Sequence, residues 1–209
     1  MSLRIDHVVY AVRDLDAAAT RFDETYGLGS VPGGVHPRWG TANRIISLGD
    51  ARYLELISIV DPEVAATTVL GQAIADRIAD GDRWFALCLG DDAIDVTVER
   101  LGLALEPGSR TLPDGRVVAW RGAGIDDPKR TPDLPFFIEW TGPPGAHPGA
   151  RAAPHRSGAG DIAWVEVSGD ADRFGTWTGE ASLPVRFVKG NPGVVAVGLS
   201  TPDGDLVIR

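Results

Sequence analysis

Three successive segments of this chain repeat one order of predicted elements, and this repeat constrains the fold more than any other feature. The apolar run at residues 5–12 predicts a strand, and apolar side chains then recur at helical spacing until Gly27. Two further strands are predicted at residues 44–48 and 52–59, and a short strand near residues 30–35 completes a β-α-β-β-β unit.

The same order returns twice. Residues 84–92 predict a strand, a helical stripe ends at Gly102, a Pro-Asp-Gly turn predicts a hairpin, and "LPFFIEW" closes the unit. A weaker third unit follows from residue 160. The aspartates predicted at the strand-to-helix junctions are 77 and 79 residues apart: Asp14, Asp91 (with Asp92 as the alternative) and Asp170. We therefore expect a single α+β domain over residues 1–209, with modules at roughly 4–60, 84–140 and 160–209.

Two connecting segments separate the modules. Between the first and second, Leu70, Ile74 and Ile78 recur every four residues and predict a helix. Between the second and third, residues 141–160 are rich in Pro, Gly and Ala and carry His147 and His155. A loop of this length is often a functional lid, and otherwise a disordered linker.

Composition excludes several classes of function. The net charge of −9 and the absence of a basic stripe argue against a nucleic-acid partner. Cys88 is the single cysteine, so neither an internal disulfide nor a Cys-x-x-Cys metal site can form. Without a signal-like leader or an apolar run near about 20 residues, we expect a cytoplasmic protein with no membrane partner.

Polar residues on the predicted strands point to a site. Strand alternation places His7 on one face with Ile5 and Val9, and it places Glu55 inside an apolar strand. A buried carboxylate is normally paired, protonated or bound to a metal, because leaving it unpaired costs several kcal/mol. A second glutamate, Glu139, recurs at the same step of the second module, whereas Trp84 is the residue that we align with His7.

Four stretches carry a family resemblance: "IDHVVYAVRDLDAAATRF", "GGVHPRWGTANRIISLGD", "YLELI" and, less specifically, "FFIEW". With them the chain resembles the vicinal oxygen chelate superfamily, and more narrowly its glyoxalase-like domain branch. The resemblance implies that two β-α-β-β-β modules curl into a half-open barrel, with the third module beside it.

The resemblance also implies a divalent ion held from the first and last strands, here by His7, Glu55 and Glu139. One imidazole and two carboxylates suit Mn²⁺, Fe²⁺, Ni²⁺ or Co²⁺, and also Zn²⁺. Trp84 departs from the pattern at the fourth position.

Each of these residues also has a simpler interpretation. His7 can be a hydrogen-bonded core histidine. Glu139 can pair with Arg116 or Arg121 of the neighbouring hairpin, and Glu55 can pair with Arg44. These ion pairs are the main alternative to metal binding for both glutamates.

The loop at residues 33–44 is expected to form the rim of the barrel and to contact a substrate through Trp39, Asn43 and Arg44, with Trp84 inside the site. His36 has three interpretations: a fourth metal ligand, an acid/base group or a turn residue. His155 is a weaker candidate at the mouth of the site, and Cys88 is expected to be a core side chain.

Two functions remain open from the sequence. The first is a metal-dependent isomerase or lyase that acts on a small α-hydroxycarbonyl or vicinal-oxygen substrate, with Glu55, Glu139 and His36 as catalytic candidates. The second is a metal-free protein that sequesters a small molecule, as the bleomycin-resistance relatives do. The third module either flanks the barrel or pairs with its counterpart in a homodimer.

Overall fold

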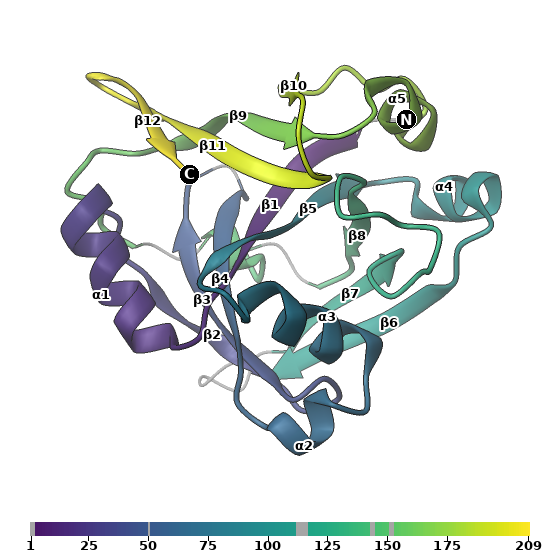
Figure 1. The fold of residues 1–209 in the computed structure, drawn as a ribbon, viewed down its shortest axis with the longest axis horizontal. Helices are drawn as coiled ribbons and strands as arrows, with labels where there is room; N and C mark the ends of the chain where they lie inside the picture. The colour runs from purple at the N-terminus through teal and green to yellow at the C-terminus, as the bar shows by residue number, and fades with distance from the viewer. Residues whose placement is uncertain (1–2, 50, 112–116, 143–144, 151–152) are drawn as a thin grey trace.

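The computed structural model describes residues 3–49, 51–111, 117–142, 145–150 and 153–209. Within them the chain forms one curled sheet of eight strands and a second sheet of four strands, with few helices (Figure 1). The fold class is therefore α+β, as the repeat predicts. Among the described residues, no helix has the length and apolarity that crossing a membrane requires.

The first module has the predicted β-α-β-β-β order. Its elements are β1 (Leu3–Ala11), α1 (Leu15–Tyr26), β2 (Val31–His36), β3 (Thr41–Ser47) and β4 (Tyr53–Ile59). Asp14 caps α1 by accepting hydrogen bonds from the backbone N–H groups of Asp16 and Ala17, and Gly27 ends the helix at a positive φ of 63°. The boundaries of α1 thus follow from the capping residues that the sequence displays.

The second module has the same order but a different cap. Its elements are β5 (Arg83–Asp91), α4 (Ile94–Leu101), β6 (Leu105–Thr111), β7 (Val117–Ala123) and β8 (Phe136–Trp140). The N-cap of α4 is Ala93, not Asp91 or Asp92, and it makes no side-chain bond. The carboxylate of Asp91 instead accepts hydrogen bonds from the Ala93 N–H and the Thr97 hydroxyl. The predicted turn at residues 113–115 lies outside the described residues.

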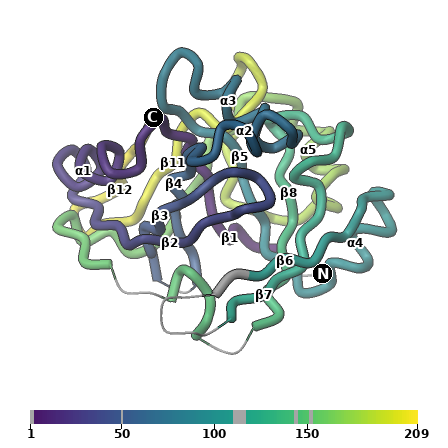
Figure 2. The backbone as a smooth tube through the Cα atoms, turned by 90° about the horizontal axis from the view of Figure 1, so that it is seen from below, coloured from purple at the N-terminus to yellow at the C-terminus, as the bar shows by residue number. Residues whose placement is uncertain are grey.

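The two modules share one sheet with the order β2-β3-β4-β1-β5-β8-β7-β6. At its centre β1 runs antiparallel to β5, and each of these strands pairs in parallel with the last strand of its own module. The sheet curls until its edge strands β2 and β6 come into contact, which gives the expected half-open barrel (Figure 2). The predicted connecting helix is split into α2 (Pro62–Ala65) and α3 (Val69–Ile78).

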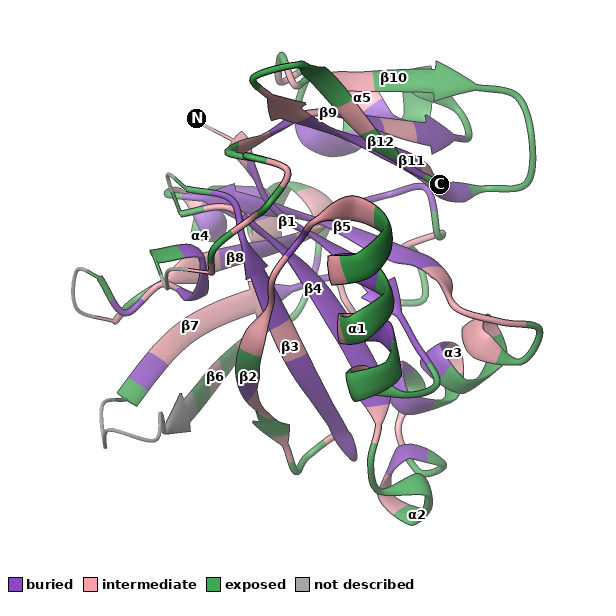
Figure 3. Cartoon of the chain, turned by 90° about the vertical axis from the view of Figure 1, so that its left-hand side faces the viewer, coloured by how far each residue is buried: buried purple, intermediate pink, exposed green. Residues whose placement is uncertain are grey.

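The third module forms the separate four-stranded sheet. Its elements are β9 (Asp161–Ser168), α5 (Ala171–Thr178), β10 (Val185–Val188), β11 (Gly193–Thr201) and β12 (Gly204–Ile208). Its strand order is β10-β9-β11-β12, so β9, the first strand of the module, lies between the second and the third. In the first two modules the first strand instead lies beside the last one. The sheet packs against the barrel through β11 and β5, and residues of both sheets belong to one buried apolar core. Figure 3 shows that much of β1, β5, β9 and β11 is buried.

Trp84 lies in this interface between the two sheets. It is 2% exposed, packs edge-on against Tyr10, and its indole N–H points to the carbonyl oxygen of Ile208 at 3.4 Å. The prediction that Trp84 contacts a substrate is therefore wrong.

Candidate functional site

A cavity of about 490 Å³ lies on the concave side of the barrel. Such a volume is typical of sites for small molecules. Five of the predicted site residues line it: His7, His36, Trp39, Asn43 and Glu55. The other predicted residues, Arg44, Trp84 and Glu139, do not. The cavity thus gathers residues from the first strand, the rim loop and the fourth strand of module one.

A β-bulge at the start of β1 shapes the floor of the cavity. Ile5 pairs with Leu89 and His7 pairs with Cys88, so Asp6 is an extra residue between them. A bulge re-aims side chains that strict alternation would send to opposite faces. The Asp6 carboxylate accordingly reaches its neighbour, with Oδ1 2.7 Å from Nδ1 of His7. Both residues are at most 3% exposed.

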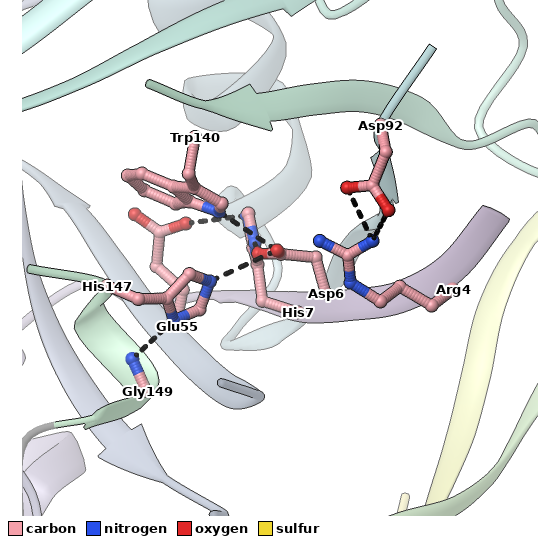
Figure 4. A network of polar contacts seen from close by, with 8 residues as sticks. All are labelled: Arg4, Asp6, His7, Glu55, Asp92, Trp140, His147 and Gly149. Carbon is pink, nitrogen blue, oxygen red and sulfur yellow. Dashed lines mark hydrogen bonds and ion pairs between the residues drawn. The ribbon is translucent and has the colours of Figure 1, made fainter. Parts of the chain in front are cut away.

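Two further N–H donors from distant segments meet the carboxylate of Asp6. Its Oδ2 accepts hydrogen bonds from the indole N–H of Trp140 at 2.9 Å and from Nε2 of His147 at 3.1 Å (Figure 4). Nδ1 of His147 accepts the backbone N–H of Gly149, so the ring proton of a neutral His147 lies on Nε2. One carboxylate therefore joins β1, β8 and the segment after β8.

Burial alone would raise the pKa of Asp6, but hydrogen bonds from His147 and His7 outweigh it and hold this pKa well below its usual range. An ionised Asp6 can only accept hydrogen bonds. Nδ1 of His7 must therefore carry a proton, and Nε2 is left as the atom that can take up or release one.

The carboxylate of Glu55 lies next to Nε2 of His7. Its Oε2 is 3.5 Å from Nε2 of His7, and its Oε1 accepts a hydrogen bond from Nδ2 of Asn43 at 2.5 Å. The amide of Asn43 is fixed in turn, because its Oδ1 accepts the backbone N–H of Gly34 at 2.8 Å. His7 and Glu55 thus form an oriented pair of proton acceptors at the cavity floor.

Two predicted site residues point away from the cavity. Glu139 accepts a hydrogen bond from Arg121 at 2.6 Å, and Arg121 also binds Asp95 on α4. Arg44 donates to Ser30 and to Asp16 on α1 rather than to Glu55, and it does not line the cavity. The arginine alternative is thus confirmed for Glu139 through Arg121, whereas Arg116 lies outside the described residues.

Strand register identifies the true counterparts of His7 and Glu55 in the second module. The helix caps Asp14 and Ala93 are 79 residues apart, which relates His7 to Ala86 and Val9 to Cys88. In the parallel ladders Glu55 lies opposite Val9, and Phe136 lies opposite Cys88. Ala86 and Phe136 therefore occupy the positions where the second module would supply metal ligands, and neither side chain can bind a metal.

Asp6, His7 and Cys88 form a buried group whose potential ligand atoms lie within 4.8 Å of one another. Their chemistry does not fit a divalent ion. Three N–H donors already engage the Asp6 carboxylate. Burial, with Asp6 and Glu55 nearby, raises the pKa of the Cys88 thiol well above its usual value and so disfavours the thiolate that a metal requires. We therefore derive no chemical step through a metal.

The rim of the cavity is the turn between β2 and β3, as predicted. Nδ1 of His36 is 3.1 Å from the hydroxyl oxygen of Thr41, and its ring packs edge-on against Trp39. Arg38 reaches across to β6, where it binds Glu106 at 2.5 Å. This ion pair spans the two edges of the half-open barrel.

Sequence reasoning missed Asp6 and His147, and it missed the hydrogen bond from Trp140 to Asp6. Asp6 adjoins His7 in "IDHVV", but alternation assigned it to the opposite face, because a bulge leaves no signal in a single sequence. Nε2 of His155, the weaker candidate for the mouth, lies 2.5 Å from the carbonyl oxygen of Ser47. Of the two loop histidines, it is His147 that reaches the site.

With this geometry in place, the chain can be compared with known proteins. The family model described as "glyoxalase-like domain" matches residues 5–181. The protein therefore belongs to the glyoxalase-like domain family. A search of curated proteins found no match.

Solved structures with a similar fold include methylmalonyl-CoA epimerase from Mycobacterium tuberculosis, at 18% identity and a TM-score of 0.47 over 68% of this chain and 89% of that one. A variant of the Streptomyces coelicolor epimerase in complex with 2-nitronate-propionyl-CoA has 22% identity and a TM-score of 0.47, over 68% and 97% of the two chains. A hypothetical protein from Bacillus halodurans has 15% identity and a TM-score of 0.45, over 67% and 94%.

Proposed function

We propose that this protein is an enzyme that moves a proton on a small carbonyl compound, with isomerase or lyase chemistry and without a resident metal ion. One observation carries the proposal: Nε2 of His7 faces Glu55 at the cavity floor while Asp6 holds Nδ1. An imidazole oriented by a buried carboxylate is the arrangement that proton-transferring histidines use in enzymes.

The reaction needs one base and a means of stabilising its charged form. Nε2 of His7 takes a proton from the carbon next to a carbonyl, and the electron pair of the broken C–H bond forms an enolate. The imidazolium that results lies between the carboxylates of Asp6 and Glu55, whose negative charges favour it. For an α-hydroxycarbonyl compound, return of this proton to the former carbonyl carbon, while the hydroxyl proton passes to the enolate oxygen, completes an isomerisation. Departure of a leaving group from the carbon next to the deprotonated one, with transfer of the proton from His7 to that group, completes an elimination.

Solvent deuterium provides the test. We would incubate chelator-treated protein with α-hydroxycarbonyl compounds in heavy water and follow exchange of the C–H proton by nuclear magnetic resonance. His7→Gln should slow exchange by about 10²–10⁴-fold, the usual contribution of a general base. Glu139→Gln is the matched control, because it removes a carboxylate outside the cavity. Exchange that requires an added divalent ion, or that survives in His7→Gln, would contradict the proposal.

Ligand sequestration is the second candidate, favoured by Phe136, an apolar side chain that lines the cavity at the position related to Glu55. The same samples separate the two functions. Tight binding of a compound without deuterium exchange in any substrate would support sequestration.

A further inference from the structure

The residues that line the cavity also indicate which kind of ligand it binds, because its walls are largely apolar and its charged groups are mostly acidic. Aromatic and aliphatic side chains form the walls between floor and mouth, among them Trp39, Phe85, Trp120, Phe136 and Trp140. The rings of Trp120 and Trp140 lie 5.7 Å apart. Such walls select a ligand with a substantial apolar part.

The charged groups that line the cavity are mostly acidic. Its carboxylates are those of Glu55, Glu106, Asp126 and Asp127. Arg38 is the one arginine or lysine among the described lining residues, and Glu106 already neutralises it. An anionic ligand would therefore meet repulsion without a free cation to bind it.

Asp126 is the acidic residue that lacks a partner. Its Oδ1 is buried and has no hydrogen-bond partner among the described residues. Asp127, its neighbour in the same loop, accepts the backbone N–H of Lys129 at 2.8 Å. Oδ1 itself is closed off from the cavity, and no ion pair among the described residues engages the Asp126 carboxylate, so the part of this side chain that lines the cavity can accept a further charged donor.

We propose that the cavity binds a hydrophobic compound with a protonated amine, which lies with the amine at Asp126 and its carbonyl end at His7 and Glu55. The inference rests on the proposed function only in using the same cavity. A charged donor would pair with the part of the Asp126 carboxylate that lines the cavity, and the aromatic walls would contact both the apolar part and the cation.

Three probes of one shape test this inference by isothermal titration calorimetry: phenylpropylamine, phenylpropanol and phenylpropanoate. The amine should bind roughly tenfold or more tightly than the alcohol, as expected for a hydrogen bond between charged groups. The carboxylate should bind most weakly. Equal affinity for amine and alcohol, or tightest binding of the carboxylate, would overturn the inference.

Two variants locate the amine. Asp126→Asn should abolish the preference for amine over alcohol, whereas the control Asp127→Asn should retain it. A preference that survives in Asp126→Asn would contradict the assigned position. Because calorimetry requires no turnover, amine binding without proton exchange would remove the proposed function alone. Proton exchange confined to anionic compounds would remove this inference alone.

Discussion

Asp6 has the largest consequences of any single residue for the site. A buried carboxylate with three N–H donors is stable only while the donors stay in place, and these come from β1, β8 and the segment after it. Removing the charge from such a cluster leaves the donors unsatisfied. The sequence could not reveal this, because Trp140 and His147 lie 134 and 141 residues from Asp6.

We expect Asp6→Asn to lower the free energy of unfolding by about 3 kcal/mol near neutral pH, as breaking a buried charged pair does. The folded-state pKa of Asp6 lies below its unfolded value of about 3.9. Its stabilisation is therefore present above about pH 4 and lost as the pH falls below it. Urea unfolding at neutral and acidic pH should show the difference between wild type and variant narrowing in acid. A difference that does not change with pH would count against this assignment.

At the scale of elements, the repeat and the capping residues predicted most strands and helices correctly. The predicted facing of side chains was wrong where the pairing of neighbouring strands is irregular. The bulge at Asp6 interrupts the alternation on β1, and on β8 the position related to Glu55 is Phe136, three residues before Glu139, so the facing predicted for Glu139 was reversed. Glu139 was thus placed in the cavity, although Phe136 and Trp140 line it. Local pattern determines an element, whereas its register depends on partners far away in sequence.

The approach of β2 to β3 depends on a glycine. A Cβ on Gly33 would lie 2.0 Å from Oδ1 of Asn43, the residue that holds Glu55. Gly33→Ala should therefore displace Asn43, destabilise the chain by about 1–3 kcal/mol and weaken ligand binding. Gly160→Ala is the control, since a Cβ there meets nothing within 4 Å. Thermal unfolding and calorimetry with the amine probe would measure both effects. Unchanged ligand affinity in Gly33→Ala would show that Asn43 does not support the site.

For the whole molecule, the third module acts as a support of the barrel. None of residues 153–209 lines the cavity, yet one apolar core joins both sheets and includes Trp84, Phe137, Trp177 and Ile208. With its strand β11, the third module covers the back of β5. The homodimer remains a prediction, which light scattering at micromolar concentration would test.

A shared core predicts that the barrel and the third module unfold together. Trp177 stacks near Phe137, with ring centroids 6.3 Å apart, and donates a hydrogen bond to the carbonyl oxygen of Pro135. Trp177→Ala should cost about 3–5 kcal/mol because it opens a cavity between the layers. Val207→Ala, at a side chain that is 36% exposed, should cost less than about 1 kcal/mol.

Urea unfolding followed by circular dichroism and by binding of the amine probe should give coincident transitions in the wild type and in both variants. Trp177→Ala should move both transitions to lower urea by the same amount. Loss of ellipticity while the cavity still binds the probe would mean that the third module unfolds alone. The core would then be two cores in contact, and the barrel would not depend on its neighbour for stability.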